Sequence, residues 1–293
     1  MDNRSDIRDF LSSRRARITP EQAGVLPGGG RRRVPGLRRE EVAVLAGVST
    51  DWYTRLEKGH IAGVSEDVLL AVARALQLTE AERTHLFNLA RAATRPARAP
   101  QRRSRPQIQP RVQWMLDSMT GSAAFVADGR LDILATNTLG RALHSPLFTD
   151  PGRPANFARF QFLDPQADDF YLDRQAAADV TVALLRAEAG RRPHDAPLRE
   201  LVGELSTVSA EFRTRWAAHD VRIHHDGVKQ FRHPVVGELE LTYGTFDMPP
   251  EDGSVLRLTI YTAEPGSASE DGLRLLASWA TTDAGAAQEV TPS

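Results

Sequence analysis

Apolar residues recur at helical spacing over the first ninety residues of the chain, and this pattern predicts a compact domain of five helices. The first helix ends before Pro20 and buries Ile7, Phe10 and Leu11. Two short helices follow within residues 38–59. A fourth helix begins near Ser65, and its buried positions are Val68, Leu69, Val72 and Leu76. The fifth starts at Thr79, which forms a capping box with Glu82.

From residue 111 the pattern changes to mixed α and β. Strands are expected at 123–126, 131–136, 221–225, 228–232, 238–246 and 256–262. The first two form a hairpin around Asp128-Gly129, and the alternation of Leu239, Leu241 and Tyr243 predicts one buried sheet face. Residues 157–162 are expected to be irregular. Helices are expected at 112–119, 137–144, 166–189, 196–205 and 209–219, with a last one from Leu273 to Trp279. An antiparallel sheet of about five strands with helices on one face is a PAS-like plan, an α+β architecture common in sensors.

A basic, proline-rich segment separates the two regions. Residues 93–110 contain four prolines with five arginines between them. Proline interrupts a continuous helix, and a packed domain does not leave so many charges unpaired, so this segment is predicted to be a linker. The domains are therefore expected at 1–92 and 111–282, and the small-residue tail at 283–293 is expected to be disordered.

The net charge of −1 conceals an asymmetry, because residues 1–105 carry +8 and residues 106–293 carry −9. A basic half joined to an acidic half suggests that one module binds a polyanion and that the other does not. The chain has no Cys, which excludes disulfides, thiolate metal sites and cysteine nucleophiles. No apolar run approaches the roughly 18 residues that span a bilayer, and the first residues are not a signal peptide. A cytoplasmic protein without membrane segments is expected.

Residues 38–59 have the spacing of two helices that meet at a tight turn. Ala43 is small enough for the helices to cross closely, and Gly47 lies four residues later, where the turn needs a positive φ angle. Val48 follows as an apolar plug, and Ser49 as the N-cap of the second helix. An ordinary helical hairpin in a core is the alternative, but these residue types rarely coincide in this register.

The second helix of this pair has one apolar stripe, formed by Tyr53 and Leu56, and a polar opposite side. Such a helix suits a DNA major groove, where short polar and cationic side chains reach base edges and phosphates. The arginines of the preceding glycine-rich loop are expected to contact phosphates, with a solvated charge run as the alternative. The predicted DNA-contacting residues are Arg31, Arg32, Arg33, Arg38, Arg39, Ser49, Thr50, Asp51, Thr54, Arg55 and Lys58.

In the second region, aromatic and polar residues are candidates for a ligand pocket, and most have a structural alternative. Asn137 is either a hydrogen-bonding group for a ligand or the N-cap of the next helix. Three phenylalanines either line an apolar pocket or belong to the core: Phe157, Phe160 and Phe162. A carboxylate head group at a pocket mouth would need a cation or donor, and the candidates are Arg159, Trp216 and His219. The alternatives are a surface cation for Arg159 and a buried anchor for Trp216. His233 completes the candidate set.

Metal binding and catalysis both find little support. Four histidines cluster in the sequence: His219, His224, His225 and His233. Adjacent histidines on a strand point to opposite faces, and no helical His-x3-His pair exists, so no metal site is expected. No Ser or Cys lies beside a base in a nucleophile motif, so neither an enzyme nor a cofactor is expected.

The run RRRVPGLRREEVAVLAGVSTDWYTRLEKGH, residues 31–60, resembles the helix-turn-helix of Xre-type, lambda-repressor-like regulators, and more closely that of MmyB-like transcription regulators. The second region resembles the ligand-binding domain of that family, with its PAS-like fold. The matching segments are LDILATN (131–137), FLDP (162–165), EFRTRWAAHDV (211–221), HPVVGELELTY (233–243) and YTAEPGS (261–267).

The resemblance implies a one-component transcription regulator. Its helical domain would bind double-stranded DNA, with two protomers acting as a homodimer, and its second domain would sense a small lipophilic molecule such as a fatty acid. Two alternatives remain open. The second domain could dock another protein without holding a ligand, or it could be an enzyme tethered to DNA.

Overall fold

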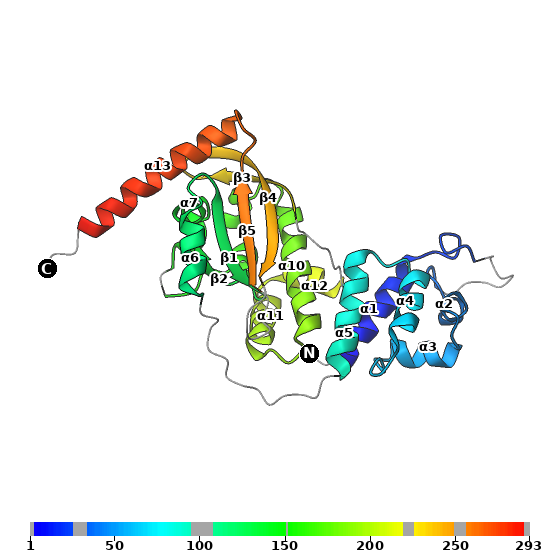
Figure 1. The fold of residues 1–293 in the computed structure, drawn as a ribbon. Helices are drawn as coiled ribbons and strands as arrows, with labels where there is room; N and C mark the ends of the chain where they lie inside the picture. Colours follow the sequence, from blue (N-terminus) through cyan, green and yellow to red (C-terminus); the bar gives the residue numbers. More distant parts are fainter. Residues whose placement is uncertain are drawn as a thin grey trace. The chain divides into compact units, whose positions relative to one another are not determined.

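The computed structural model describes residues 3–25, 34–94, 108–150, 152–218, 226–248 and 256–289. Figure 1 shows the fold. The chain divides into two compact units. The first comprises residues 1–101, 183–204 and 213–223, and the second comprises residues 102–182, 205–212 and 224–293. The domain limits drawn from the sequence remain a prediction.

Five helices of the described N-terminal region form a bundle, as the apolar spacing predicted. They are α1 (Asn3–Arg17), α2 (Arg39–Ala46), α3 (Thr50–Glu57), α4 (Glu66–Ala75) and α5 (Glu80–Thr94). One cluster of buried side chains forms the core and includes Ile7, Phe10, Val42, Tyr53 and Leu86. The predicted capping box begins α5, since Thr79 N donates to Glu82 Oε2 (2.8 Å) and Glu82 N to Thr79 Oγ1 (3.3 Å).

A five-stranded antiparallel sheet is the centre of the second unit, and its strand order is β2-β1-β5-β4-β3. The strands are β1 (Ala123–Asp128), β2 (Ile133–Thr136), β3 (Asp226–His233), β4 (Gly237–Met248) and β5 (Leu256–Thr262). In β4 the buried Leu239 and Leu241 alternate with exposed residues, so the predicted period of two is confirmed. The α+β class and the strand number are confirmed as well.

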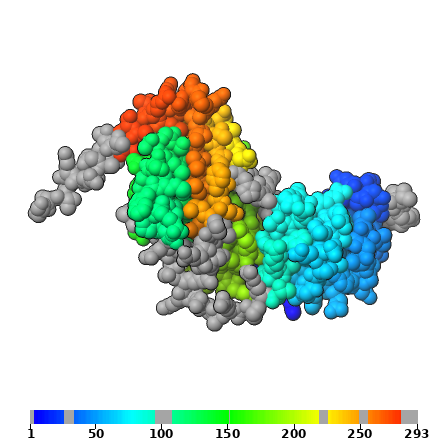
Figure 2. Space-filling view, viewed as in Figure 1, coloured from blue at the N-terminus to red at the C-terminus, as the bar shows by residue number. Residues whose placement is uncertain are grey.

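Helices cover both faces of this sheet, whereas the sequence predicted one. α7 (Thr138–Leu143) and α13 (Ala268–Glu289) pack against each other, α7 also against β1 and α13 also against β4; Figure 2 shows α13 in orange-red beside the green helices. α6 (Pro110–Asp117) packs on the opposite face, where its Leu116 joins Val126 and Leu258. β1 is buried at all six positions, and its first five residues are apolar, so its sequence had no alternation to reveal the second layer.

Other helices depart from the predicted limits. Residues 157–162 are helical, because α8 (Phe157–Leu163) begins at the N-cap Asn156. The expected long helix at 166–189 is two helices, α9 (Gln166–Phe170) and α10 (Arg174–Arg191). α13 continues to Glu289 through residues expected to be disordered, and the alanines there are strong helix formers. The expected strand at 221–225 and most of the linker lie outside the described residues.

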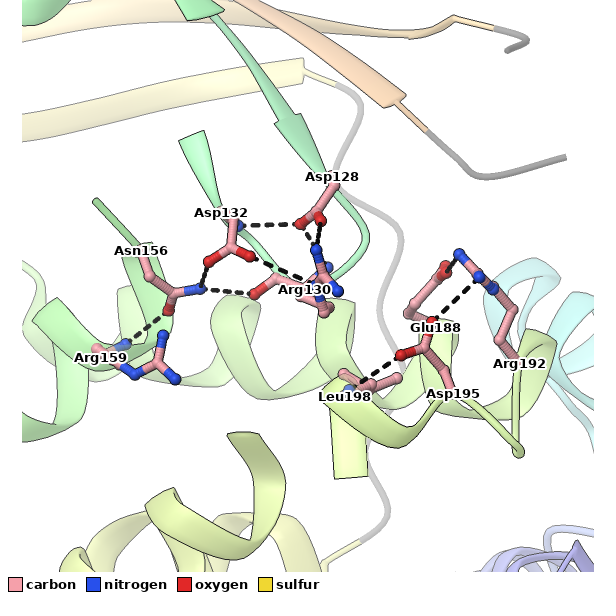
Figure 3. Close-up of polar contacts among 9 residues, drawn as sticks. All are labelled: Asp128, Arg130, Asp132, Asn156, Arg159, Glu188, Arg192, Asp195 and Leu198. Carbon is pink, nitrogen blue, oxygen red and sulfur yellow. Dashed lines mark hydrogen bonds and ion pairs between the residues drawn. The ribbon is translucent and has the colours of Figure 1, made fainter. Parts of the chain in front are cut away.

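The last two helices before β3 follow α10 closely: α11 (Ala196–Val208) and α12 (Ala210–Ala217). The corner between α10 and α11 is held by charges (Figure 3). Arg192 forms ion pairs with Glu188 (3.9 Å) and Asp195 (3.1 Å), and Asp195 Oδ1 accepts from Leu198 N (3.0 Å). Over the described ranges of the chain, no helix combines the length and apolarity that a membrane crossing needs.

Each edge of the sheet carries a short backbone bridge. Asp132 pairs with Asn156 beside β2, where Ile133 N donates to Ala155 O (2.8 Å). Tyr171 pairs with Phe231 beside β3, and this bridge lies in the segment between α9 and α10. A local contact also marks this break, because Asp173 Oδ1 accepts from Ala176 N (2.9 Å) and so caps the start of α10.

Candidate DNA-binding surface and ligand site

The turn between α2 and α3 has the predicted geometry. Gly47 has a φ of +68°, the left-handed conformation that glycine adopts without strain. Val48 N donates to Ala43 O (2.9 Å), which closes the end of α2. Ser49 is the N-cap of α3, since its Oγ accepts from Trp52 N (3.1 Å). These contacts fix the direction in which α3 leaves the turn.

The side of α3 predicted to face DNA is turned to solvent. Tyr53 and Leu56 are buried on the opposite side. The predicted contacts Ser49, Thr50, Asp51, Arg55 and Lys58 are exposed, and Thr54 is half-buried. Within the described ranges, the side chains of Arg55 and Lys58 form no ion pair, so both remain available to an outside anion. In Figure 2, α2 and α3 (sky blue) lie on the surface of the helical bundle.

A buried carboxylate joins α3 to two other helices. Glu57 is only 1% exposed, and its oxygens accept from Arg15 Nη2 (2.9 Å) and Arg39 Nη2 (3.2 Å). Burial lowers the pKa of Arg15, but the hydrogen bonds and charge of Glu57 outweigh this and raise it. Burial also raises the pKa of Tyr53, and the charge of Glu57 adds to that rise. The cluster therefore fixes α3 against α1 and α2.

This cluster changes the role expected of Arg39. Its side chain is half exposed, but its guanidinium is already bound to Glu57. Arg39 therefore helps to orient α3, in addition to the surface position that was expected of it. Arg38 has no contact with Glu57 among those described: its Nη1 contacts Glu40 at the surface (3.3 Å), and its backbone N–H donates to Glu41 Oε2 (2.6 Å). Glu57 was not singled out from the sequence, although its place four residues after Tyr53, on the apolar stripe, was the available signal. Arg31, Arg32 and Arg33 lie outside the described residues.

Asn137 is a structural cap rather than a free group. It is 4% exposed, and its Oδ1 accepts from Gly140 N (2.7 Å) and Ala124 N (3.0 Å). Its Nδ2 donates to Met119 O and Ser122 O, both at 2.7 Å. All of its main hydrogen-bonding positions are thus occupied, so the N-cap alternative describes it and nothing is left for a ligand.

The three phenylalanines of α8 are dispersed. Phe157 packs against Phe125 (4.8 Å between ring centroids), and Phe160 against Phe170 (5.6 Å). Phe162 instead contacts Phe212 of α12 (5.1 Å). The first two aromatic side chains of the helix therefore pack in the core beside the sheet, and the third packs against α12.

The polar candidates are likewise separated. Arg159 is half-buried, and its backbone N donates to Asn156 Oδ1 (2.9 Å), as Figure 3 shows. Trp216 lies under the guanidinium of Arg186, 4.1 Å from the ring centroid. His233 is buried at the end of β3, where its Nε2 contacts Ala142 O (3.0 Å) and its Nδ1 accepts from Val235 N (3.2 Å). His219, His224 and His225 lie outside the described residues, and the described part of the chain has no group of three metal-ligating side chains.

The inner face of the sheet contains a different group that no sequence pattern pointed to. His144, just after α7, is 1% exposed and surrounded by aromatic rings, with centroids 5.3 Å from Phe125, 5.6 Å from Tyr261 and 5.9 Å from Phe231. Its Nδ1 contacts Gly140 O (3.1 Å), and its Nε2 has no hydrogen-bond partner among the described residues. Burial lowers the pKa of His144 to about 3, so the ring is neutral near pH 7.

Lys229 of β3 approaches the same interior. Its Nζ lies 5.0 Å from the ring centroid of Tyr171 and 6.0 Å from that of Phe231. Burial lowers the pKa of Lys229 to about 8 and raises the pKa values of Tyr171 and Tyr261. This inner-face cluster, defined as His144, Tyr171, Lys229, Phe231 and Tyr261, combines an apolar wall with several donors. No sequence motif marks it, because its members come from separate elements.

Two family models match the chain. The MmyB-like transcription regulator ligand binding domain matches residues 108–276, more than half of the chain, and a helix-turn-helix domain matches residues 13–86. A search of curated proteins found no match. Both matched families are regulator domains, in agreement with the helix-turn-helix surface and the separate α+β unit described above. The chain therefore belongs to the MmyB-like transcription regulators, with a helix-turn-helix DNA-binding domain followed by a ligand-binding domain.

Proposed function

We propose that this regulator binds its operator as a homodimer through α3, and that a lipophilic, fatty-acid-like ligand in a PAS-like domain controls that binding. The observation that carries the DNA-binding part is the solvent-facing side of α3, where Thr50, Asp51, Arg55 and Lys58 are exposed above a buried Tyr53–Leu56 stripe. A helix with this division can enter the major groove without disturbing its own core packing.

The lipophilic nature of the ligand is supported by the inner face of the sheet. Aromatic side chains from α8, α9, β3 and β5 meet there, and their rings offer a large apolar contact area. The polar members of the inner-face cluster are few and come from separate elements, as expected where a mainly apolar molecule is oriented by a small number of polar groups. No comparable set of opposed, titratable carboxylates supports a reaction at this place among the described residues.

The coupling between ligand and DNA is the mechanistic part of the proposal. A dimer engages successive major grooves when its recognition helices lie about 34–36 Å apart. A ligand that alters how two protomers present α3 changes this spacing, and such coupling typically changes affinity by about 5- to 150-fold.

The test begins with selection of duplexes from a random pool by the full-length protein. Binding to the selected duplex is then measured with and without dodecanoate, together with the stoichiometry of the complex. The proposal expects two protomers on a two-fold symmetric site and an affinity that changes with the fatty acid. Selection of no sequence contradicts the DNA-binding part. Equal affinity and stoichiometry with bound fatty acid contradict the coupling, and a ligand domain that takes up no lipophilic molecule favours a protein-docking role.

A further inference from the structure

We propose that the inner-face cluster recognises the acidic head group of an apolar ligand, with Lys229 as counter-ion and the hydroxyls of Tyr171 and Tyr261 as hydrogen-bond donors. This inference rests on the proposed function, because it assigns the head group of the same lipophilic ligand. It differs from the sequence expectation, which placed head-group recognition at Arg159, Trp216 and His219.

The strand geometry places Lys229 on the inner face. Side chains alternate along β3, and Phe231, two residues after Lys229, is fully buried against the core. Gln230 and Arg232 are exposed and bind Glu240 and Glu238 of β4 (2.7 Å and 3.2 Å). Two outward positions of the strand therefore carry paired polar groups and a third carries the exposed Val228, whereas the inward position beside Phe231 carries a cation.

The residue type at this position is informative. Arginine supplies 35 of the 37 basic residues, so Lys229 is one of only two lysines in the chain. Within the described residues, no carboxylate lies within ion-pair distance of its Nζ, and the burial that lowers its pKa has no opposing acidic contribution. A partly buried ammonium group without a counter-ion is unfavourable, which is the condition that an acidic ligand would relieve.

Hydrogen-bonding groups without protein partners surround the cation. Tyr171 and Tyr261 are 5% and 3% exposed, and no described residue hydrogen-bonds to either hydroxyl. The ring of Tyr243 lies 5.8 Å from that of Tyr261, and Tyr171 and Tyr243 both contribute to the rise in the pKa of Tyr261. The charge of Lys229 contributes to the lowered pKa of His144, whose buried Nε2 also has no partner among the described residues. These groups thus face one common interior.

The donors and apolar rings of the inner-face cluster together indicate which chemical class of ligand fits there. An ammonium group and phenol hydroxyls all donate hydrogen bonds, and a carboxylate oxygen accepts several of them at once. The rings of Phe160, Phe170 and Phe231 then contact an apolar chain attached to that carboxylate. An ester of the same chain keeps the apolar contacts but has no charge for Lys229, so the site should distinguish an acid from its ester.

The test is isothermal titration calorimetry of the full-length protein at pH 7 with dodecanoate and with methyl dodecanoate. We expect the wild type to prefer the acid, and Lys229→Met to weaken acid binding by about tenfold or more, the usual effect of removing a charge-assisted hydrogen bond. Ester binding should stay unchanged in that variant, and Lys229→Arg should restore acid binding. Arg232→Met, on the outward side of the same strand, is the matched control and should leave both ligands unaffected.

The pH dependence provides a second readout. The titratable groups of the same interior are His144 after α7, Tyr171 after α9, Tyr243 of β4 and Tyr261 of β5. Burial holds the pKa of His144 at about 3 and raises those of the tyrosines, so these groups keep their neutral forms between pH 7 and 9. Lys229, with a pKa lowered to about 8, loses its charge over this interval. Acid affinity should therefore fall from pH 7 to pH 9 in the wild type and stay level in Lys229→Met and Lys229→Arg.

The outcomes separate the two proposals. If the wild type binds acid and ester with equal affinity and Lys229→Met changes neither affinity, the proposal of a lipophilic ligand is retained but the assigned head-group site is wrong. If the wild type binds neither compound, the proposed lipophilic ligand fails and the head-group site fails with it. An acid preference that is identical in wild type and Lys229→Met also overturns the assignment.

Discussion

Single side chains determine how this regulator presents its recognition helix. Glu57 is buried at the end of α3 and bound by Arg15 and Arg39, so one carboxylate positions three helices. Arg55 lies on the same helix but points to solvent. The two residues are two positions apart and therefore face different sides of the helix, one structural and one open to DNA.

The first residue-scale prediction concerns Arg55. Arg55→Ala should relax sequence preference at one operator position and weaken specific binding by about 1–3 kcal/mol, because an arginine paired with a base supplies that much discrimination. Competition between the selected duplex and single-position variants measures the effect. Unchanged stability shows that the fold is intact. A uniform loss over all sequences would instead assign Arg55 to the phosphate backbone.

The second concerns Asn137, whose buried amide links α7 to β1 and to the segment after α6. Asn137→Ala leaves the backbone N–H groups of Ala124 and Gly140 without this acceptor, and should reduce the free energy of unfolding by about 3 kcal/mol. Asn88→Ala, a partly exposed position in α5, should change it by less than about 0.5 kcal/mol. Urea unfolding of both variants provides the comparison, and equal values would contradict the role given to Asn137.

The same residue indicates how far sequence could predict the site. The pattern allowed Asn137 to be either a cap or a ligand contact, and only the positions of Ala124, Met119 and Ser122 decide between them. The exposed face of α3 was predictable, because helical periodicity determines which residues share a side. Lys229 and His144 were not, since strands and helices distant in sequence bring them together.

At the scale of elements, local signals proved reliable where a turn or cap requires a particular residue. The left-handed Gly47 and the Thr79–Glu82 capping box are both present as predicted. Elements that depend on distant contacts were predicted less well. α8 contains only seven residues, and the break before α10 contains the bridge between Tyr171 and Phe231 of β3.

The turn gives an element-scale prediction. Gly47→Ala should destabilise the helical bundle by about 1 kcal/mol, because a side chain disfavours the left-handed conformation even though a Cβ atom would meet nothing within 4 Å. Gly121→Ala is the matched control, with equal space and no positive φ. Thermal unfolding followed by circular dichroism measures both, and equal midpoints would show that the turn tolerates a side chain.

At the scale of the whole molecule, the uneven charge distribution suits binding of a polyanion by one region only. The N-terminal 105 residues carry +8 and the remainder −9, so non-specific attraction to DNA acts mainly on the helix-turn-helix region. This distribution was readable from sequence, and so were the family and the two kinds of fold. Dimer formation remains a proposal, since no zipper motif in the sequence indicates it.

The whole-molecule prediction concerns the arginine loop. Replacing Arg31, Arg32 and Arg33 together by Gln should weaken binding to all duplexes alike, because phosphate contacts do not distinguish bases. The dependence of log affinity on log salt should become shallower by about one unit for each phosphate that an arginine no longer neutralises. Titrations at several salt concentrations, with selected and unrelated duplexes, measure both effects. A change in preferred sequence would instead place these arginines at base edges.

The bridges on either side of the sheet have a consequence for self-association. Asn156 occupies part of the β2 border and Tyr171 part of the β3 border, so neither offers an uninterrupted row of free amides to another molecule. Two copies would consequently meet through helices or loops rather than by extending one sheet into the next. Removing the Tyr171 pairing should leave β3 as an unpaired edge strand that can bind another copy of the chain. Such a variant should aggregate during storage.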